Sequence, residues 1–337
     1  MIRFFARARY DFIGLRRWAY GLSALLILPG LVLLLISGLN YSIEFTGGTL
    51  VQVETARALS LPQLRTALEG VGLAGSEVKT FGADTAYSIT ARFGPEAADA
   101  STQSVAEAVG RALDATAGVG AYRVVRTEAS TPKVGGELQE KAIIAILFSF
   151  VVTLIYLAMR FEWRFGVAAV FATAHDIAAT VAFIRYLNLE VSLVVVAAVL
   201  TIVGYSLNDT IVIFDRLREN LRKYRRQNLY EILNLSVNET LPRTILTGGT
   251  TMMTALALAF IAGEVIRPFA LVMAFGILVG TFSSIYVASP VLLWIERRWP
   301  GQDVRGARTY AGPGTTPSAA PGPAPAPPTG GRSKAAV

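Results

Sequence analysis

Two acidic residues lie inside otherwise apolar stretches of this chain, where their chemistry would involve protons. Asp176 follows His175, the single histidine, and Asp209 lies in the polar run GYSLNDT at residues 204–210. A charged side chain at the centre of a bilayer costs about 2.5 to 3.5 kcal/mol on the translocon scale. Each of these residues therefore needs a compensating role, either binding and releasing protons or holding helices together.

The surroundings of Asp209 favour the protonatable role over simple helix packing. Tyr205 and Asp209 are four residues apart and share one helix face, so the phenol is placed to hydrogen-bond the carboxylate. Arg243, directly after Pro242, is expected at a similar depth in the cytoplasmic half of the membrane. We therefore expect an Asp209–Arg243 interaction, although Arg243 equally fits an ordinary anchor whose charge reaches the headgroups.

For His175 and Asp176 the spacing predicts separate partners. Adjacent residues project about 100° apart on a helix, so these two side chains are not expected to form a simple pair. They are either buried polar groups that hold helices together or part of a relay. The candidate relay and coupling residues are Asp209, Arg243, Asp176, His175, Tyr205 and Asn208.

The composition indicates that these residues belong to a membrane protein. The 337 residues are 53% hydrophobic and 16% charged, with a mean hydropathy of +0.48, whereas soluble domains contain about 25% charged residues. We expect a polytopic α-helical membrane protein with six transmembrane helices, at residues 18–39, 142–159, 165–187, 191–214, 244–262 and 266–294. A water-soluble enzyme is excluded.

The distribution of Lys and Arg orients the six spans. The short loops rich in Lys and Arg, together with the N-terminus, fall on one side, which is the cytoplasmic side by the positive-inside rule. Residues 1–39 are thus a cytoplasmic N-terminus and an uncleaved first span, because the apolar run is longer than the 7–15 residues of a signal peptide core. We expect a multi-pass protein of the inner cell membrane with both termini in the cytoplasm.

Between the first two spans, residues 40–140 form a polar segment of strand and helix patterns. Strands are predicted at 49–54, 77–81, 87–93 and 122–128, and helices at 61–70 and 101–115. The order βαββαβ is that of a ferredoxin-like α+β sandwich. We expect one small extracytoplasmic domain of this fold.

The remaining chain divides into the other five spans, at 141–298, and a tail at 299–337. Leu217, Leu221 and Tyr224 recur at helical spacing among basic residues, which predicts an amphipathic segment near 215–240 lying on anionic lipids. Gly276 and Gly280 have the GxxxG spacing of a helix-packing face, within the chain or against a second subunit. The tail is rich in Pro, Gly and Ala and is expected to be disordered.

Enzyme signatures are missing from the sequence. There is no Walker A, HExxH or GxSxG pattern, no Cys, and a single His. We therefore expect no enzymatic activity, no cofactor, no metal site and no nucleic-acid partner.

Several motifs together resemble a known family. The run Glu44-Phe45-Thr46-Gly47-Gly48 follows the first span, His175-Asp176 and the GYSLNDT run lie in later spans, and Pro242-Arg243 begins the fifth. A cytoplasmic motif follows span four, with Asp215, Arg216, Arg218, Glu219 and Asn220. The sequence resembles the SecF family of bacterial protein-export membrane proteins, related to SecD and part of the RND superfamily. One departure is Glu44, where the family pattern has Asp.

The resemblance implies a function in protein export. It implies pairing with SecD and association with the SecYEG translocon, with YajC and YidC as further candidate partners. The complex would use protons of the proton-motive force to promote translocation of a preprotein substrate. Asp209 and Arg243 match the residues implicated in proton passage in that family, and residues 44–48 would couple the external domain to the first span.

Two other functions remain open from the residues. An RND-type transporter of lipids or small solutes would also contain intramembrane carboxylates and an external domain, although such proteins usually carry both halves in one chain. A passive assembly subunit that stabilises a translocase is the third alternative.

Overall fold

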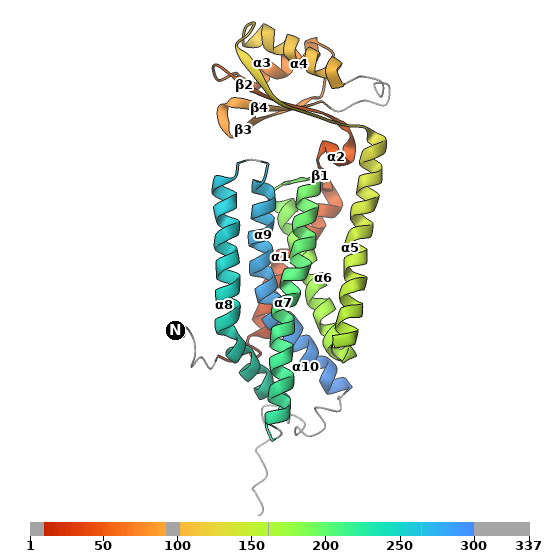
Figure 1. Ribbon diagram of the computed structural model, residues 1–337, viewed down its shortest axis with the longest axis vertical. Coiled ribbons are helices and arrows are strands. Elements are labelled where there is room, and N and C mark those ends of the chain that lie inside the picture. Colours follow the sequence, from red (N-terminus) through yellow and green to blue (C-terminus); the bar gives the residue numbers. More distant parts are fainter. Residues whose placement is uncertain (1–9, 92–101, 161, 225, 264, 300–337) are drawn as a thin grey trace, which may run out of the picture.

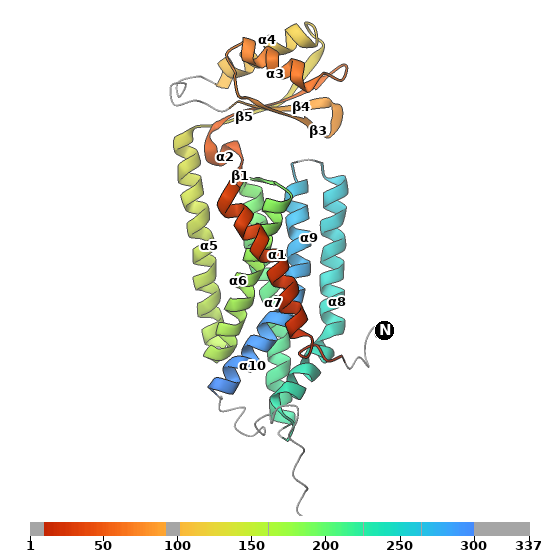
Figure 2. The same ribbon diagram turned by 180° about the vertical axis from the view of Figure 1, so that it is seen from behind.

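The computed structural model describes residues 10–91, 102–160, 162–224, 226–263 and 265–299. A bundle of long helices stands below a small α+β domain, and both ends of the described chain lie at the end of the bundle away from that domain (Figures 1 and 2). The predicted disordered tail beyond Trp299 lies outside the described residues.

Six helical segments within the described residues are long and apolar enough to cross a membrane. They are α1 (Arg16–Ser37), α5 (Pro132–Arg160), α6 (Trp163–Tyr186), α7 (Leu193–Lys223), α8 (Leu229–Ile261) and a composite last span. The last span consists of α9 (Arg267–Ser283), a π-helical turn η1 (Ser284–Ala288) and α10 (Ser289–Arg298). The prediction of a polytopic helical membrane protein is confirmed, and the π-turn was not anticipated.

Helices α7 and α8 are longer than the apolar pattern predicted. Segment 215–240 is not a separate helix on the membrane surface, since residues 215–223 are the last turns of α7 and residues 229–240 are the first turns of α8. Leu217 and Leu221 are buried against Ile232 and Leu233. The prediction that this apolar face contacts lipid was therefore wrong, because the neighbouring helix covers it. Pro242 likewise lies inside α8 rather than at the start of a span.

The N-terminal segment also packs on this helical hairpin. The Tyr10 amide donates to Asn238 Oδ1 at 2.9 Å, and the Ile13 amide donates to Asn234 Oδ1 at 3.0 Å. Partial burial raises the pKa of Asp11, but hydrogen bonds from Tyr230, Gly14 and Asn234 outweigh it and hold that pKa below its ordinary value. The segment before α1 is thus fixed to the beginning of α8.

The domain contains one antiparallel sheet with two helices on one face. Its elements are β2 (Gly48–Thr55), α3 (Leu61–Gly70), β3 (Glu77–Phe81), β4 (Ala83–Ala91), α4 (Thr102–Thr116) and β5 (Tyr122–Ser130). The strand order is β3-β4-β2-β5, and Val51 of the central strand faces Ile89 on one side and Thr127 on the other. Helices α3 and α4 cover the face away from the bundle (Figure 1). The predicted ends at Phe93 and Ser101 lie outside the described residues.

A short junction connects the domain to the bundle. Strand β1 (Asn40–Tyr41) pairs in parallel with β6 (Glu190–Val191), and the four-residue helix α2 (Ile43–Thr46) follows β1. The end of α1 is therefore held beside the start of α7 by main-chain hydrogen bonds, including Ser42 N to Val191 O at 2.9 Å. These small elements have no hydrophobic period and were not predicted.

Glycines allow the central spans to approach closely. A Cβ on Gly276 would lie 2.2 Å from Ile202 Cδ1, and one on Gly280 would lie 2.9 Å from Ser206 Cβ. The GxxxG pair of α9 therefore packs on α7 within this chain, as small residues do between membrane helices.

Candidate functional site

Asp209 lies deep in α7 and faces α9. It is only 3% exposed, and it follows Leu193 by 16 positions, which correspond to about 24 Å of helix and place it toward the predicted cytoplasmic side. Thr281 Oγ1 donates to Asp209 Oδ2 at 3.4 Å, a long hydrogen bond. A nearly buried carboxyl group with one weak hydroxyl partner is chemically suited to gain or lose a proton.

The expected partners of Asp209 are arranged differently from the sequence prediction. The Tyr205 hydroxyl points toward α8, beside Gly248 and Thr251, and no hydrogen bond joins it to Asp209 among the described residues. Arg243 is exposed on α8, and no ion pair joins it to Asp209 in the described part of the chain. Asn208 is exposed on the neighbouring face of α7.

His175 and Asp176 contact each other, contrary to the sequence prediction. His175 Nδ1 lies 3.0 Å from Asp176 Oδ1, and His175 Nε2 lies 2.9 Å from Ser23 Oγ on α1. The side-chain torsions of neighbouring residues bring the two groups together although their Cα–Cβ bonds diverge. The two side chains also have separate partners, as the sequence predicted, since His175 and Asp176 each bond a residue of another helix.

Asp176 joins three further spans to α6. It is fully buried, and its Oδ2 accepts hydrogen bonds from Ser206 of α7 and from Ser283 of α9, the latter at 2.8 Å. Through His175 and Ser23 the same network reaches α1. Buried polar groups are costly unless they are satisfied, so this carboxyl group fixes the relative positions of α1, α6, α7 and α9.

The two carboxyl sites share one short segment of the last span. Thr281 bonds Asp209, Ser283 bonds Asp176, and Ser284 Oγ lies 2.8 Å from Thr210 Oγ1. The π-turn η1 begins at Ser284, and in Figure 1 α10 diverges from the direction of α9 below it. Since π-bulges are frequent at functional sites and at kinks, this segment is positioned to respond to both carboxyl groups.

The predicted domain-coupling motif forms the junction above the bundle. Glu44 Oε2 accepts a hydrogen bond from the Leu193 amide at 2.6 Å, at the first turn of α7. Phe45 is buried among residues of α7 and α9, and Thr46 Oγ1 donates to the Ser42 carbonyl at 3.1 Å. Gly47 has φ of 75° and Gly48 has φ of 135°, values that favour glycine because a Cβ would be strained there. The motif thus turns the chain from α2 into β2.

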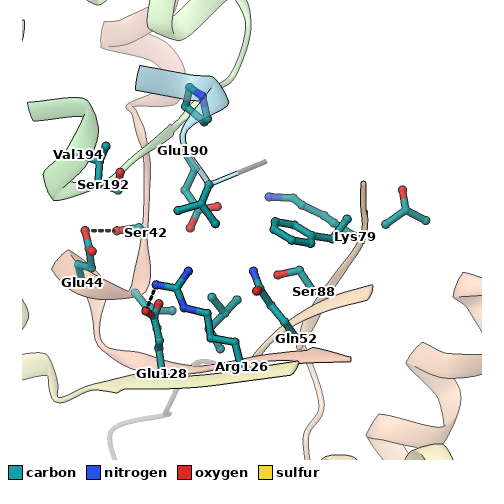
Figure 3. Close-up of a pocket in the computed structure, with 16 residues that line it drawn as sticks. Ser42, Glu44, Gln52, Lys79, Ser88, Arg126, Glu128, Glu190, Ser192 and Val194 are labelled. Carbon is teal, nitrogen blue, oxygen red and sulfur yellow. Dashed lines mark hydrogen bonds and ion pairs between the residues drawn. The ribbon is translucent and has the colours of Figure 1, made fainter. Parts of the chain in front are cut away.

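A cavity of about 270 Å³ separates the open face of the sheet from the bundle. Gln52, Ser88 and Lys79 project into it from the sheet, next to the ion pair of Arg126 and Glu128 (Figure 3). Glu190, Ser192 and Val194 line the opposite side, and Glu44 with Ser42 close one end (Figure 3). The domain therefore rests on the bundle through its junction and leaves space beneath the sheet.

The motif at residues 215–220, which the sequence predicts to be cytoplasmic, forms an ion-pair network. Arg160 pairs with Asp215 at 2.9 Å, and Arg216 pairs with Glu219 at 2.6 Å and with Glu239 of α8 at 2.7 Å. Two motif residues remain. Arg218 donates to the Arg160 carbonyl, and the Asn220 amide donates to the side chains of Ser236 and Glu239. The motif therefore holds the ends of α5, α7 and α8 together.

Gly135 provides a close contact that the sequence did not reveal. A Cβ at this position of α5 would lie 2.5 Å from the Phe45 carbonyl oxygen, whereas one on Gly136 would meet nothing within 4 Å. We expect Gly135→Ala to lower the free energy of unfolding by about 1 to 3 kcal/mol, because the α2 backbone has to move. Gly136→Ala should be neutral or slightly stabilising, since it gains helix propensity alone.

Thermal unfolding of the two purified variants checks this prediction. Because both substitutions add the same methyl group to the same helix, the difference between their unfolding midpoints isolates the contact with Phe45. Equal midpoints for the two variants would mean that α2 does not pack against α5 at this point.

Other residues of the site were also missed from the sequence. Ser206, Thr281 and Ser283 bond the carboxyl groups, and Ser284 bonds the hydroxyl group of Thr210 beside Asp209. Two adjacent serines in an apolar span were the available signal, but hydroxyl groups inside membrane helices usually bond their own helix backbone, as Thr247 does to Arg243 O. Sequence spacing alone does not show which hydroxyl groups reach another helix.

The comparisons with known proteins agree in one family. Residues 95–298 match the family described as "Protein export membrane protein SecD/SecF, C-terminal", and residues 32–58 match the "SecD/SecF GG Motif". The protein translocase subunit SecF of Gemmatimonas aurantiaca is 52% identical over 307 residues, which are 90% of this chain and 92% of the relative. That of Rickettsia rickettsii is 38% identical and covers 86% and 93%.

Two solved structures are similar as well. The crystal structure of SecDF from Thermus thermophilus, described as a translocon-associated membrane protein, superposes with a TM-score of 0.77 at 35% identity. The match covers 88% of this chain and 40% of that one. SecDF in a super-membrane-facing form gives a TM-score of 0.62 at 36% identity, covering 86% and 39%. This chain therefore spans about two fifths of the SecDF chains it matches.

Proposed function

This chain belongs to the SecF family of protein translocase subunits, and from that premise we propose that it promotes preprotein export as the partner of a separate SecD chain. The match covers 92% and 93% of the SecF relatives but 40% and 39% of the SecDF chains, which supports SecD as the partner of a SecF-type chain. SecYEG is the proposed translocon, and YajC and YidC remain further candidate partners. The proposal assigns the chain no enzymatic reaction.

The proposed energy source is the proton-motive force. The observation that supports it is Asp209, a nearly buried carboxyl group whose hydroxyl partner lies on the π-turned last span. One elementary charge crossing 100 mV is worth about 2.3 kcal/mol, which shifts a two-state equilibrium by about fifty-fold at 25 °C. One proton bound at Asp209 would therefore suffice to change the relative positions of α7 and α9. Arg243 would adjust the charge at this site, and Asp176 with His175 would hold the surrounding helices.

The proposed coupling path runs along α7. Asp209 and Leu193 belong to one uninterrupted helix, and Leu193 is bonded to Glu44 at the junction with the external domain. A shift of α7 would pull on the junction and hence on the sheet above it. Glu44 is longer by one methylene than the Asp of the family pattern, and its 2.6 Å bond supports its suitability for this contact.

The remaining parts of the proposal concern fold and orientation. The strand order β3-β4-β2-β5 supports a ferredoxin-like domain, and we place this domain on the extracytoplasmic side. Both termini are then cytoplasmic, in the cell membrane. Anionic lipids of the cytoplasmic leaflet are the proposed surroundings of the basic helix ends.

Purification of the tagged full chain from native membranes in mild detergent tests the export role. We expect a SecD-like six-span chain and translocon subunits to copurify. Recovery with unrelated envelope-lipid proteins, or recovery alone, would contradict the proposal and favour the RND-type solute transporter. Intact export by a variant in which both Asp209 and Arg243 are neutralised would favour a passive assembly role.

A further inference from the structure

An open hollow of about 570 Å³ lies between the end of α5 and the last turns of α7. It is lined by Arg160, Asp215, Arg218, Glu219, Arg222 and Lys223. Arg218 Nη1 lies 3.5 Å from the Arg160 carbonyl oxygen, and Arg160 pairs with Asp215. These contacts join the two helices that form the walls, so the hollow is a feature of the packed bundle.

The lining has an excess of positive charge. Four of its six residues are cationic and two are carboxylates, which leaves a net charge of +2. One carboxylate, Asp215, is bonded to Arg160, and the other, Glu219, is bonded to Arg216 outside the hollow. The lining therefore complements a ligand with two negative charges.

Tryptophan side chains mark the depth of the hollow in the membrane. Trp163, Trp294 and Trp299 are exposed and form edge-to-face contacts at the ends of α6 and α10, where an interfacial aromatic belt is expected. Arg160 precedes Trp163 by three residues, and Lys223 lies about 12 Å beyond Asp215 along α7. The end of the hollow at Arg160 and Asp215 thus lies at the headgroup layer, which is about 5 to 8 Å thick on each side of the hydrocarbon core, and the end at Lys223 extends beyond it toward the cytoplasm.

The flank of α5 leads directly from this hollow into the hydrocarbon region. Only 6% of the apolar stretch of α5 is buried, and Val151, Leu154 and Ile155 are exposed within the three turns before Arg160. In Figure 1 this helix stands at the edge of the bundle. A ligand whose charged head lies in the hollow would have an apolar surface beside it for its hydrocarbon chains. An acidic protein segment has no such chains and would not use this surface.

We propose that this hollow binds the headgroup of a diphosphatidylglycerol lipid, cardiolipin, from the cytoplasmic leaflet. Its two phosphodiesters match the net charge of the lining, and basic pockets between membrane helices on this side recognise such headgroups. Arg218, Arg222 and Lys223 bind the phosphates, and acyl chains lie along α5. The inference rests on the orientation given in the proposed function and is independent of the export role.

Native mass spectrometry of the purified full chain, titrated with cardiolipin after delipidation, tests this site. We expect the triple variant R218Q/R222Q/K223Q to lose apparent affinity by about tenfold or more, because each basic residue near the surface contributes to anionic lipid binding. The matched control R17Q/R297Q/R298Q removes the same charge from other cytoplasmic positions and should keep the wild-type affinity. The charge-retaining variant R218K/R222K should bind within about threefold of wild type.

The outcomes separate the alternatives. An equal loss in both triple variants would overturn the site and indicate only general charge attraction. The site would also be overturned if the wild-type protein bound cardiolipin no better than phosphatidylcholine. It would likewise be overturned if an acidic protein partner required Arg218, Arg222 and Lys223 for copurification while lipid binding did not require them. Measuring preprotein export for the same variants keeps a failure of lipid binding distinct from a failure of the export role.

Discussion

Replacing Asp209 with Asn is expected to abolish the gradient-dependent part of preprotein export while leaving the folded protein intact. The amide oxygen of Asn still accepts the hydrogen bond from Thr281, so the packing of α7 on α9 is kept. The variant, however, cannot gain or lose a proton at this position. Export in membrane vesicles should therefore fall to the rate measured after the proton gradient is collapsed, a difference of up to about fifty-fold per 100 mV for one coupled charge.

Two further variants make this result interpretable. Asp209→Glu retains the titratable group and should keep part of the gradient-dependent rate, because the longer side chain misplaces the carboxyl group against Thr281. Glu231→Gln changes an exposed carboxylate at the start of α8 and should export like wild type. Normal gradient-dependent export by Asp209→Asn would contradict the proton-coupling role of this residue.

Asp176→Ala is expected to destabilise the bundle more than most single substitutions. It removes the acceptor of Ser206 Oγ and His175 Nδ1, which are buried or nearly so, and leaves Ser283 Oγ with the Gly280 carbonyl of its own helix. A buried polar group left unsatisfied costs about 1 to 3 kcal/mol, and a cavity is created as well. We expect a loss of about 3 kcal/mol or more in the free energy of unfolding, measured by thermal or denaturant unfolding in detergent.

Two control variants accompany Asp176→Ala. One changes the same position, and the other changes a different residue of the same helix. Asp176→Asn keeps an acceptor oxygen for one serine and should cost less than Asp176→Ala. Thr173→Ala removes a buried hydroxyl that bonds only the Ala169 carbonyl of its own helix and should cost about 1 kcal/mol. If Asp176→Ala were no more destabilising than Thr173→Ala, the network between four spans would not contribute to stability.

Much of this architecture follows from local features of the chain. Apolar runs long enough to span a bilayer are visible without any structure, because each span has to bury about 20 consecutive residues in hydrocarbon. The two helices of the small α+β domain were predicted near their observed ends by their own periodicity, since Leu64 and Leu68 form one buried face in α3, and Val109 and Leu113 form one in α4. The buried positions of Asp176 and Asp209 were also foreseeable, because polar residues in apolar helices avoid lipid.

Contacts between distant residues were not foreseeable in the same way. His175 and Asp176 were predicted to be unpaired from the 100° helical offset, yet the offset constrains Cα–Cβ directions and not the ends of rotatable side chains. The apolar face of residues 217–221 was expected to meet lipid, and the amphipathic pattern alone does not distinguish lipid from the first turns of α8. The β1–β6 pairing and the Gly135–Phe45 contact join segments far apart in the chain.

The sequence by itself determined the class of protein, the number of its spans and the identity of the residues with chemistry, because hydrophobic length and residue type are local properties. Only the tertiary structure decided which groups act together. It placed Thr281, Ser283 and Ser284 of one π-turned span against Asp209, Asp176 and Thr210, and it bonded Glu44 to the start of α7. Such contacts depend on how helices rotate and cross when they pack, which no local pattern specifies.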